Sequence, residues 1–313
     1  MTRRLLRLAF ALLVLALALV VAEFAARVVF RHARTSGNAR DFVAQHRPPP
    51  DIRTNSLGFR EREIPPTSDR YRIVVVGDSF TWGQGVDERD RFSDLIGDAL
   101  GPRYEVFNFG RPGDNMPEHL EVLAQALRVS PDFVLLQLYI NDFETASMQR
   151  PEPKPLLPAR WDRTLERSSL LYDLLRDEWA TVQQQVGITD SYARYMERNL
   201  RDPASPNARL AYGQLGEFFD RARAAGVHVG CVLFPAPDSL GPYGRDYPFG
   251  YLHEGVRRIC AEKQVPCLDL LPLYSTVADP RTLWVSPFDA HPNAMSHHRA
   301  AEQILSAFRS VWR

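Results

Sequence analysis

The feature that most constrains the fold is an alternation of short apolar runs with longer amphipathic segments from residue 72 onward. Short runs rich in Val, Ile, Leu and Phe are typical of buried strands, and amphipathic segments are typical of helices that cover a sheet. The predicted strands are 72–76, 104–109, 133–138, 227–234 and 265–270, and the predicted helices are 92–100, 117–129, 208–225, 250–263 and 295–311. This alternation predicts an α/β fold with a mostly parallel sheet and helices on both faces.

The first predicted strand ends in a segment that places a serine at the edge of the sheet. The apolar run 73–76 leads into Gly77, Asp78 and Ser79, which is typical of a buried strand that breaks into a tight turn. In an open α/β sheet such a turn lies at the carboxyl edge, where ligands bind. The hydroxyl group of Ser79 would then face a cleft. Taken alone, the segment is equally well explained as an ordinary exit from a strand.

The ends of the next two predicted strands carry groups that can face the same cleft. The strand 104–109 is followed by Gly110, Pro112 and Gly113, which force a tight turn and let the backbone approach a ligand closely. The strand 133–138 is closed by a segment that contains Asn141, whose side-chain amide can point into the cleft. Each segment by itself can be explained by turn formation.

A fourth segment lies just before the C-terminal helix. It contains Asp289 and His291, followed by Pro292, which stiffens the turn, and Asn293, which can cap the helix. His291 would therefore be held at the helix entrance. Together, the four segments supply a nucleophile, a base, an orienting carboxylate and oxyanion donors, which are the groups that acyl transfer requires.

The four segments resemble the blocks of the SGNH (GDSL-type) hydrolase superfamily. In the order of that family, the blocks are matched by Ser79, Gly113, Asn141 and His291, and the resemblance covers roughly residues 71–313. It implies a flavodoxin-like three-layer α/β/α fold and a carboxylic ester hydrolase without a cofactor or a metal ion. The chain looks most like a membrane-anchored bacterial member, related to alginate O-acetyltransferase-like proteins.

The resemblance also implies a role for each matched residue. Ser79 would be the nucleophile and His291 the general base, while the backbone N–H groups of Ser79 and Gly113 and the Asn141 amide would form the oxyanion hole. Asp78 and Asp142, each adjacent to one of these residues, are expected to support the site.

One position departs from the pattern of the family. The family usually has Asp three residues before the histidine, where this chain has Phe288. Asp289, two residues before His291, is the predicted orienting carboxylate. The alternative is a Ser–His pair whose imidazole is oriented by a backbone carbonyl.

The resemblance points to ester chemistry but does not identify the acyl group or the alcohol. An anchored, exported member looks most like an enzyme that acts on O-acyl esters, above all O-acetyl esters, of envelope or secreted carbohydrates. With water as acceptor the chain would be an esterase or deacylase, which is the expected function. With a sugar hydroxyl as acceptor it would be a polysaccharide O-acetyltransferase. The third alternative is a catalytically silent envelope protein that binds glycans or partners.

The N-terminal segment predicts a membrane location. Residues 8–22 form an uncharged apolar run, and residues 8–30 give about 34 Å of helix at 1.5 Å per residue, enough to cross a bilayer. We expect an anchor over residues 1–30, with the catalytic domain exported to the periplasmic side of a bacterial inner membrane. The alternative is a signal peptide, cleaved after Ala22, and a secreted protein. Arginines flank the run on both sides, so the positive-inside rule gives no orientation.

Two further segments complete the predicted organisation. Residues 31–70 are expected to be a linker, with a proline-rich stretch at 47–50, that ends in a packing segment around 55–60. Within the hydrolase domain, 71–313, residues 143–206 interrupt the strand–helix pattern and predict a helical insertion or lid, with a helix over 168–185.

Composition excludes some partners. The 38 basic residues balance the 38 acidic residues, so no nucleic-acid partner is expected. The histidines and cysteines show no metal-ligand spacing. Cys260 and Cys267 could form a small disulfide loop in an oxidising compartment or remain buried thiols, and Cys231 is expected to be a small core residue.

Overall fold

The computed structural model describes residues 2–29, 52–286 and 289–312. The linker expected before residue 52 and the position of Phe288 therefore lie outside the described residues. The described chain divides into two units. We call residues 2–29 and 150–195 the helical unit, and residues 52–149 and 196–312 the sheet unit.

The sheet unit is built on five parallel strands. They are β1 (Tyr71–Gly77), β2 (Tyr104–Gly110), β3 (Phe133–Leu138), β4 (His228–Leu233) and β5 (Cys267–Asp269), in the order β2-β1-β3-β4-β5. This is the flavodoxin-like order, in which β1 lies between β2 and β3 and the ligand crevice opens at their carboxyl ends. The predicted fold class is confirmed.

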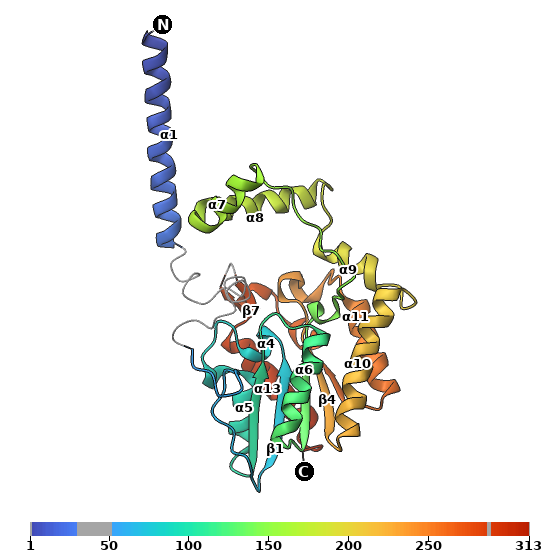
Figure 1. Ribbon diagram of the computed structural model, residues 1–313. Helices are drawn as coiled ribbons and strands as arrows, with labels where there is room; N and C mark the ends of the chain where they lie inside the picture. Colours follow the sequence, from blue (N-terminus) through green and yellow to red (C-terminus); the bar gives the residue numbers. More distant parts are fainter. Residues whose placement is uncertain (1, 30–51, 287–288, 313) are drawn as a thin grey trace. The chain divides into compact units, whose positions relative to one another are not determined.

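Helices cover both faces of this sheet (Figure 1). On one face, α5 (Phe92–Leu100) packs against α13 (Ala294–Phe308). On the other face lie α6 (Met116–Ala126), α10 (Pro206–Ala224) and α11 (Gly250–Glu262). Alternate strand residues such as Ile73 and Val75 join the apolar faces of α5 and α13 in one buried cluster. The core thus fixes the strand ends that carry the polar segments.

Several short elements were not predicted or differ from the prediction. Ser79 to Trp82 form a single helical turn, α4, directly after β1. The expectation of a turn at His291 was wrong, because Asp289–Pro292 form strand β7, which pairs antiparallel with β6 (Trp284–Ser286). Strands of three or four residues carry too few side chains for a periodic pattern. Pro292 fits because it is the last residue of β7, and the expected cap of α13 by Asn293 is present.

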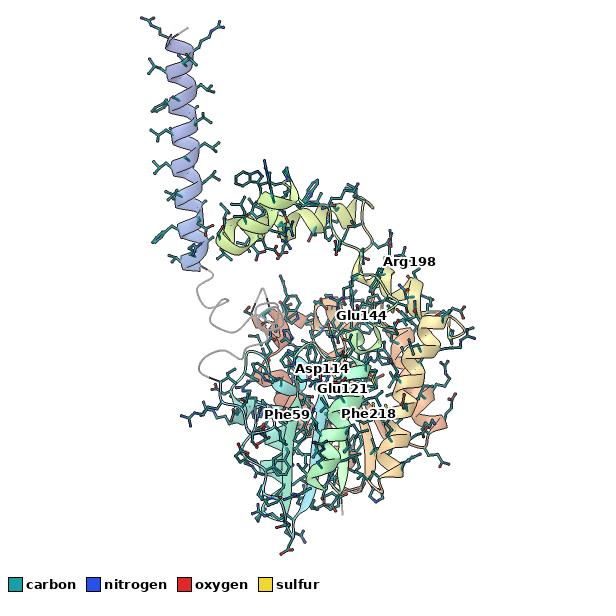
Figure 2. The ribbon with its side chains drawn as sticks, in the orientation of Figure 1. Phe59, Asp114, Glu121, Glu144, Arg198 and Phe218 are labelled. Atoms are coloured by element: carbon teal, nitrogen blue, oxygen red, sulfur yellow. The ribbon has the colours of Figure 1, made fainter. Side chains whose placement is uncertain are left out.

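Residues 55–60 pack against the sheet unit. The Asn55 side chain accepts hydrogen bonds from the backbone N–H groups of Leu57 and Phe59, which closes a tight turn. Phe59, labelled in Figure 2, is 2% exposed and stacks on Phe109 of β2 with ring centroids 4.2 Å apart. Arg60 follows and reaches the end of α4, as described below.

The helical unit consists of α1 (Thr2–Val29), α7 (Ala159–Ser168), α8 (Leu170–Gln185) and the beginning of α9 (Tyr192–Leu200). Within α1, the 26 residues Arg3–Val28 have a mean hydropathy of 2.8 in their most apolar window, none of which is buried. The α1 side chains project on all sides of the helix (Figure 2). By length and composition, α1 can cross a membrane. It is the one such helix among the described residues.

Candidate active site

Ser79 begins the short helix α4 at the carboxyl end of β1. The preceding Asp78 caps this helix, because its Oδ1 accepts a hydrogen bond from the Phe80 N–H at 2.9 Å. A Cβ at Gly77 would lie 2.2 Å from the Thr81 Oγ1, so only glycine allows the chain to turn so closely. Ser79 is 7% exposed. The hydroxyl therefore stands at the N-terminus of a helix whose start is fixed by the preceding two residues.

Hydrogen bonds to other parts of the unit hold α4 in place. The Thr81 N–H and Oγ1 both donate to the Gln137 side-chain oxygen on β3, at 3.1 and 2.7 Å. At the other end of α4, the Arg60 guanidinium donates to the carbonyl oxygens of Gly83 and Val86, at 2.9 and 3.0 Å. Gly83 is the C-cap of α4, and Val86 lies in the turn that follows. The position of Ser79 is thus fixed from both ends of its helix.

His291 on β7 brings the two distant segments together. Its Nε2 lies 3.0 Å from the Ser79 Oγ, and its Nδ1 lies 2.5 Å from the Asp289 Oδ1. The same Asp289 oxygen accepts the His291 backbone N–H at 3.1 Å. The three side chains therefore form one continuous row of hydrogen bonds, and the partner of Nδ1 is the carboxylate rather than a backbone carbonyl.

The surroundings of Asp289 favour its ionised form. Burial alone would raise its pKa, but the hydrogen bonds and the charge of His291 hold the pKa below its usual value. The second carboxylate oxygen accepts the Gln84 side-chain N–H at 3.4 Å. Gln84 is 1% exposed and was not singled out from the sequence. A carboxylate next to an imidazole can fix its tautomer and stabilise the imidazolium form.

The three predicted oxyanion donors all follow neighbouring strands. Gly113 has a φ of 82°, in the left-handed region that favours glycine, in the turn after β2. Asn141 lies after β3, in a short 3-10 helix (Ile140–Phe143), and is half-buried. Its Oδ1 is buried without a partner among the described residues. Ser79, Gly113 and Asn141 therefore come from β1, β2 and β3, the strands at the reversal of strand order.

A buried polar cluster lies next to these residues. The His119 Nε2 on α6 is 2.9 Å from the Asp142 Oδ1, and the other Asp142 oxygen accepts the Tyr139 N–H at 2.6 Å. His119 is fully buried, and Asp142 is 1% exposed. Burial alone would lower the pKa of His119, but the carboxylates of Asp142, Asp114 and Asp78 raise it. The pair ties α6 to the segment that carries Asn141.

His119 was not predicted as a site residue. It lies three residues after Met116 and four before Leu123, a helical spacing that could have placed it on the buried face of α6. Asp78 belongs to the same group of charges. It is fully buried, and its Oδ2 has no partner among the described residues. Burial and the nearby Asp142 carboxylate raise the pKa of Asp78 to about 7. Asp78 and Asp142, predicted as supporting residues, are thus both buried beside the site.

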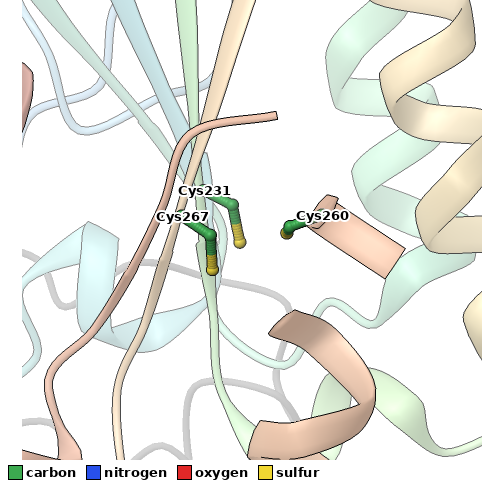
Figure 3. Close-up of side chains that lie close together, drawn as sticks. All are labelled: Cys231, Cys260 and Cys267. Carbon is green, nitrogen blue, oxygen red and sulfur yellow. The ribbon is translucent and has the colours of Figure 1, made fainter. Parts of the chain in front are cut away.

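A cysteine cluster lies elsewhere in the sheet unit (Figure 3). Cys231 on β4 pairs in register with Cys267 on β5, and Cys260 projects from α11. All three are free thiols, so the structure contains no Cys260–Cys267 disulfide. Their sulfur atoms lie within 4.8 Å of one another, a spacing that could hold a soft metal ion. The spacing of the three cysteines in the chain does not reveal this cluster, because the cluster depends on the register of β4 and β5 and on the packing of α11.

Residues 75–299 match the model of the GDSL-like lipase/acylhydrolase family. No curated protein shows significant sequence similarity to the chain.

Solved structures with a similar fold include a GDSL-family lipolytic protein of Veillonella parvula, with 14% identity and a TM-score of 0.47, covering 76% of this chain and 98% of that one. The acetyl xylan esterase AlAXEase has 16% identity and a TM-score of 0.46, covering 75% and 98%. The esterase EstA of a Pseudoalteromonas species has 13% identity and a TM-score of 0.46, covering 77% and 97%. Because the family model matches most of the chain, the chain belongs to the GDSL-like lipase/acylhydrolase family.

Proposed function

We propose that this chain is a serine esterase or deacylase that removes O-acyl groups, above all O-acetyl groups, from carbohydrates of the cell envelope or from secreted carbohydrates. The observation that carries the proposal is the row of hydrogen bonds from Ser79 through His291 to Asp289. Membership in an acylhydrolase family agrees with this chemistry. The carbohydrate part rests on the resemblance to anchored, exported members of that family.

In the first half of the reaction, the Ser79 Oγ attacks the ester carbonyl carbon while the His291 Nε2 takes the hydroxyl proton. The distance of 3.0 Å between these atoms is within hydrogen-bond reach for this transfer. The Asp289 carboxylate accepts a hydrogen bond from the His291 Nδ1–H group, which keeps Nε2 unprotonated and available as the base. His291 then gives its proton to the leaving sugar oxygen, which leaves an acyl-serine.

The negative charge on the former carbonyl oxygen needs donors that are in place before the reaction. In this proposal they are the backbone N–H groups of Ser79 and Gly113 and the Asn141 side-chain amide. In the second half, His291 takes a proton from water, whose oxygen attacks the acyl carbon. Collapse of that intermediate releases the carboxylic acid and returns the proton to Ser79.

We also propose that α1 remains attached and anchors the enzyme, with the sheet unit on the periplasmic side. Support comes from the apolar run of Arg3–Val28, which is long enough to cross a bilayer. This location would place the enzyme next to envelope and secreted polysaccharides. The location and the chemistry are separate parts of the proposal and are tested separately.

The chemistry is tested with the full chain in detergent, by p-nitrophenyl acetate hydrolysis and by acetate release from an O-acetylated polysaccharide. Ser79→Ala is the inactive variant. Ser306→Ala, an exposed serine on α13, is the matched control. We expect release by the parent and by the control, and a loss of at least about 10³-fold with Ser79→Ala. Longer p-nitrophenyl esters then define the preferred acyl group.

Three results would change the proposal. If acetyl groups appear on an added polysaccharide rather than in free acetate, the chain is a transferase that uses the same site. If Ser79→Ala is as active as the parent, the assignment of the nucleophile is wrong. If the parent is inert and a serine-directed phosphonate does not label Ser79, the chain is a silent binding protein.

A further inference from the structure

The last turns of α1 complete the N-terminal cap of α8, whose N-cap residue Ser169 accepts the Tyr172 N–H through its own hydroxyl. The Glu23 carboxylate accepts hydrogen bonds from the first two backbone N–H groups of α8, those of Leu170 and Leu171, at 3.1 and 2.9 Å. It also accepts the Ser169 hydroxyl at 2.8 Å. A carboxylate at this position satisfies N–H groups that have no partner within the helix and interacts favourably with the helix dipole. The cap joins two segments that lie almost 150 residues apart in the chain.

Arg27 strengthens this junction. It forms an ion pair with Glu23 at 2.5 Å, one helical turn away, and its second guanidinium nitrogen donates to the Ser168 carbonyl at 2.8 Å. This carbonyl belongs to the last turn of α7. Both helices of the insertion are therefore joined to the same two residues of α1.

The position of this junction along α1 sets its depth in a membrane. The uncharged apolar run of α1 ends at Ala22, directly before Glu23. The uncharged run 8–22 gives about 22 Å of helix, somewhat less than the roughly 30 Å thickness of the hydrocarbon layer, and Arg7 and Glu23 bound it at its two ends. When α1 crosses a bilayer, Glu23 and Arg27 therefore lie at its polar boundary. The start of α8 is fixed at that level, and α8 runs across the direction of α1 (Figure 1).

The packed face of α8 is polar, which is unusual for a helix in a water-soluble protein. The Tyr172 hydroxyl donates to the Asp162 carboxylate at 2.6 Å, and Arg176 pairs with Glu166 at 2.5 Å. Further along, Gln183 is fully buried and exchanges hydrogen bonds with the backbone of residue 154. Hydrogen bonds and ion pairs thus make the contacts that apolar side chains usually make.

An adjacent face of α8 is apolar and exposed. Leu175 and Val182 are seven residues apart, which places them on one stripe of the helix, and Val186, the C-cap of α8, follows four residues later. They are 51%, 41% and 64% exposed. On the neighbouring helix α7, Trp161 is 53% exposed, with the Arg160 guanidinium 5.4 Å from its ring centre. Exposed aliphatic residues, tryptophan and arginine are the residue types of helices that lie in a membrane interface.

We propose that α7 and α8 lie on the surface of the bilayer that α1 crosses, with the apolar stripe of α8 inserted at the boundary between headgroups and acyl chains. The partner of this surface is a lipid bilayer. The inference rests on the anchoring part of the proposed function and is independent of the ester chemistry. It makes the insertion a membrane-bound platform rather than a lid, and it requires that α1 stays attached, because Glu23 is part of the fold.

The experiment measures the contact of single positions with lipid. Leu175→Trp and Val182→Trp place a reporter on the stripe, and Gln184→Trp places one on the exposed polar face as a matched control. Each full-length variant is reconstituted in vesicles of phosphatidylethanolamine and phosphatidylglycerol, with and without bromine on the acyl chains. The parent signal, which contains the native tryptophans, is subtracted. Mass spectrometry of protein isolated from membranes gives its N-terminus.

We expect an intact N-terminal helix and at least twofold stronger quenching by brominated lipid at positions 175 and 182 than at position 184. Equal quenching at the three positions in a chain that retains α1 would overturn the surface contact and leave the anchor in place. A chain that begins at or after Glu23 would overturn the anchor and the surface contact together. The circular dichroism spectrum and the thermal unfolding midpoint of the same samples show whether the variants are folded, which keeps this result separate from the ester chemistry.

Discussion

At the scale of single residues, the site depends on contacts between positions that are far apart in the chain. Ser79 and His291 are 212 positions apart, yet their reactive atoms lie 3.0 Å from each other. The segment motifs predicted both residues and Asp289 correctly as neighbours, because each follows or precedes a recognisable element. Gln84 and His119 were missed, since a buried polar side chain has no motif of its own and is found only through its partner.

The Asn141 amide offers a test of the oxyanion hole. We expect Asn141→Ala to lower kcat by about 10²–10³-fold, because one preorganised donor to the developing charge is lost. The thermal unfolding midpoint should stay near that of the parent, since the Asn141 Oδ1 has no partner among the described residues. Steady-state kinetics and thermal unfolding of the same sample check both statements. A folded variant with parental kcat would remove Asn141 from the oxyanion hole.

The role of Asp289 is tested by a substitution that keeps its shape. In Asp289→Asn the amide can present its N–H group to the His291 Nδ1, which would hold the imidazole in the wrong tautomer. We expect kcat to fall by about 10³–10⁴-fold with little change in KM. The comparison with Asp289→Ala separates loss of charge from the wrong tautomer. Parental kcat in both variants would instead favour a Ser–His pair without an orienting carboxylate.

The raised pKa of Asp78 leads us to expect that the free energy of unfolding depends on pH. The pKa of Asp78 is raised to about 7 in the folded chain by burial and by the Asp142 carboxylate. An unfolded chain loses this proton near pH 4, so between about pH 4 and pH 7 the folded state holds one more proton than the unfolded state. The free energy of unfolding should therefore fall by a few kcal/mol over this interval and then level off.

In Asp78→Asn this contribution is absent, while the side-chain oxygen can still cap α4. Urea unfolding of parent and variant at pH 5 and pH 8 measures the effect. The variant should gain stability relative to the parent at the higher pH. A difference between the two proteins that is the same at both pH values would show that Asp78 does not titrate in this range.

At the scale of elements, the short helix α4 is positioned by the strands around it. The end of β2 passes so close to α4 that a Cβ at Gly110 would lie 2.1 Å from the Trp82 backbone nitrogen. Backbone atoms cannot move aside as the end of a side chain can, so the two elements would have to separate. This contact couples the turn that carries Gly113 to the helix that carries Ser79.

We expect Gly110→Ala to destabilise the sheet unit by about 2 kcal/mol or more and to lower kcat, because α4 must shift. Gly250→Ala is a matched control, since a Cβ there would meet no atom within 4 Å. Chemical unfolding and p-nitrophenyl acetate kinetics of both variants measure the two effects. Equal stability of the two variants would show that the ends of β2 and α4 are less tightly packed than the structure indicates.

The regular elements were predictable because their periodic patterns reflect burial. Strand β3 and helix α5 have the predicted bounds, and the other predicted strands and helices differ mainly at their ends. The hairpin of β6 and β7 was not predictable, because strands of three and four residues are too short to show a periodic pattern of apolar residues. Helix α7 was also not predicted, since its contacts with α8 are polar and leave no apolar stripe to recognise.

At the scale of the whole molecule, the two units are stabilised by different kinds of interaction. The sheet unit is held by a large apolar core, and the buried cluster around Ile73 and Val75 includes no residue of 150–195. The helical unit is held by the Glu23 cap and by polar contacts between α7 and α8. A sequence pattern predicts the first kind of unit well and the second poorly, because hydrogen-bonded pairs have no periodic signature.

Removal of residues 150–190 tests the independence of the sheet unit, because it leaves α9 with its buried Tyr195 in place. We expect a chain in which this segment is replaced by a flexible Gly/Ser linker to hydrolyse p-nitrophenyl acetate within a few-fold of the parent, because the buried residues of the sheet unit and the strand ends are unchanged. Kinetics with p-nitrophenyl esters of different acyl length measure the substrate range. A folded product with an altered range would show that the insertion acts as a lid.

The division into units has a consequence for proteolytic release of the sheet unit. The chain passes between the two units three times: between residues 29 and 52, near residue 149 and near residue 195. A protease that cuts only the first passage leaves two covalent connections to α7–α8, which α1 continues to hold through the Glu23 cap. If α1 anchors the chain as proposed, shedding of the sheet unit therefore requires cuts at the other two passages as well, and a single cut between residues 29 and 52 would leave the sheet unit attached to α7–α8.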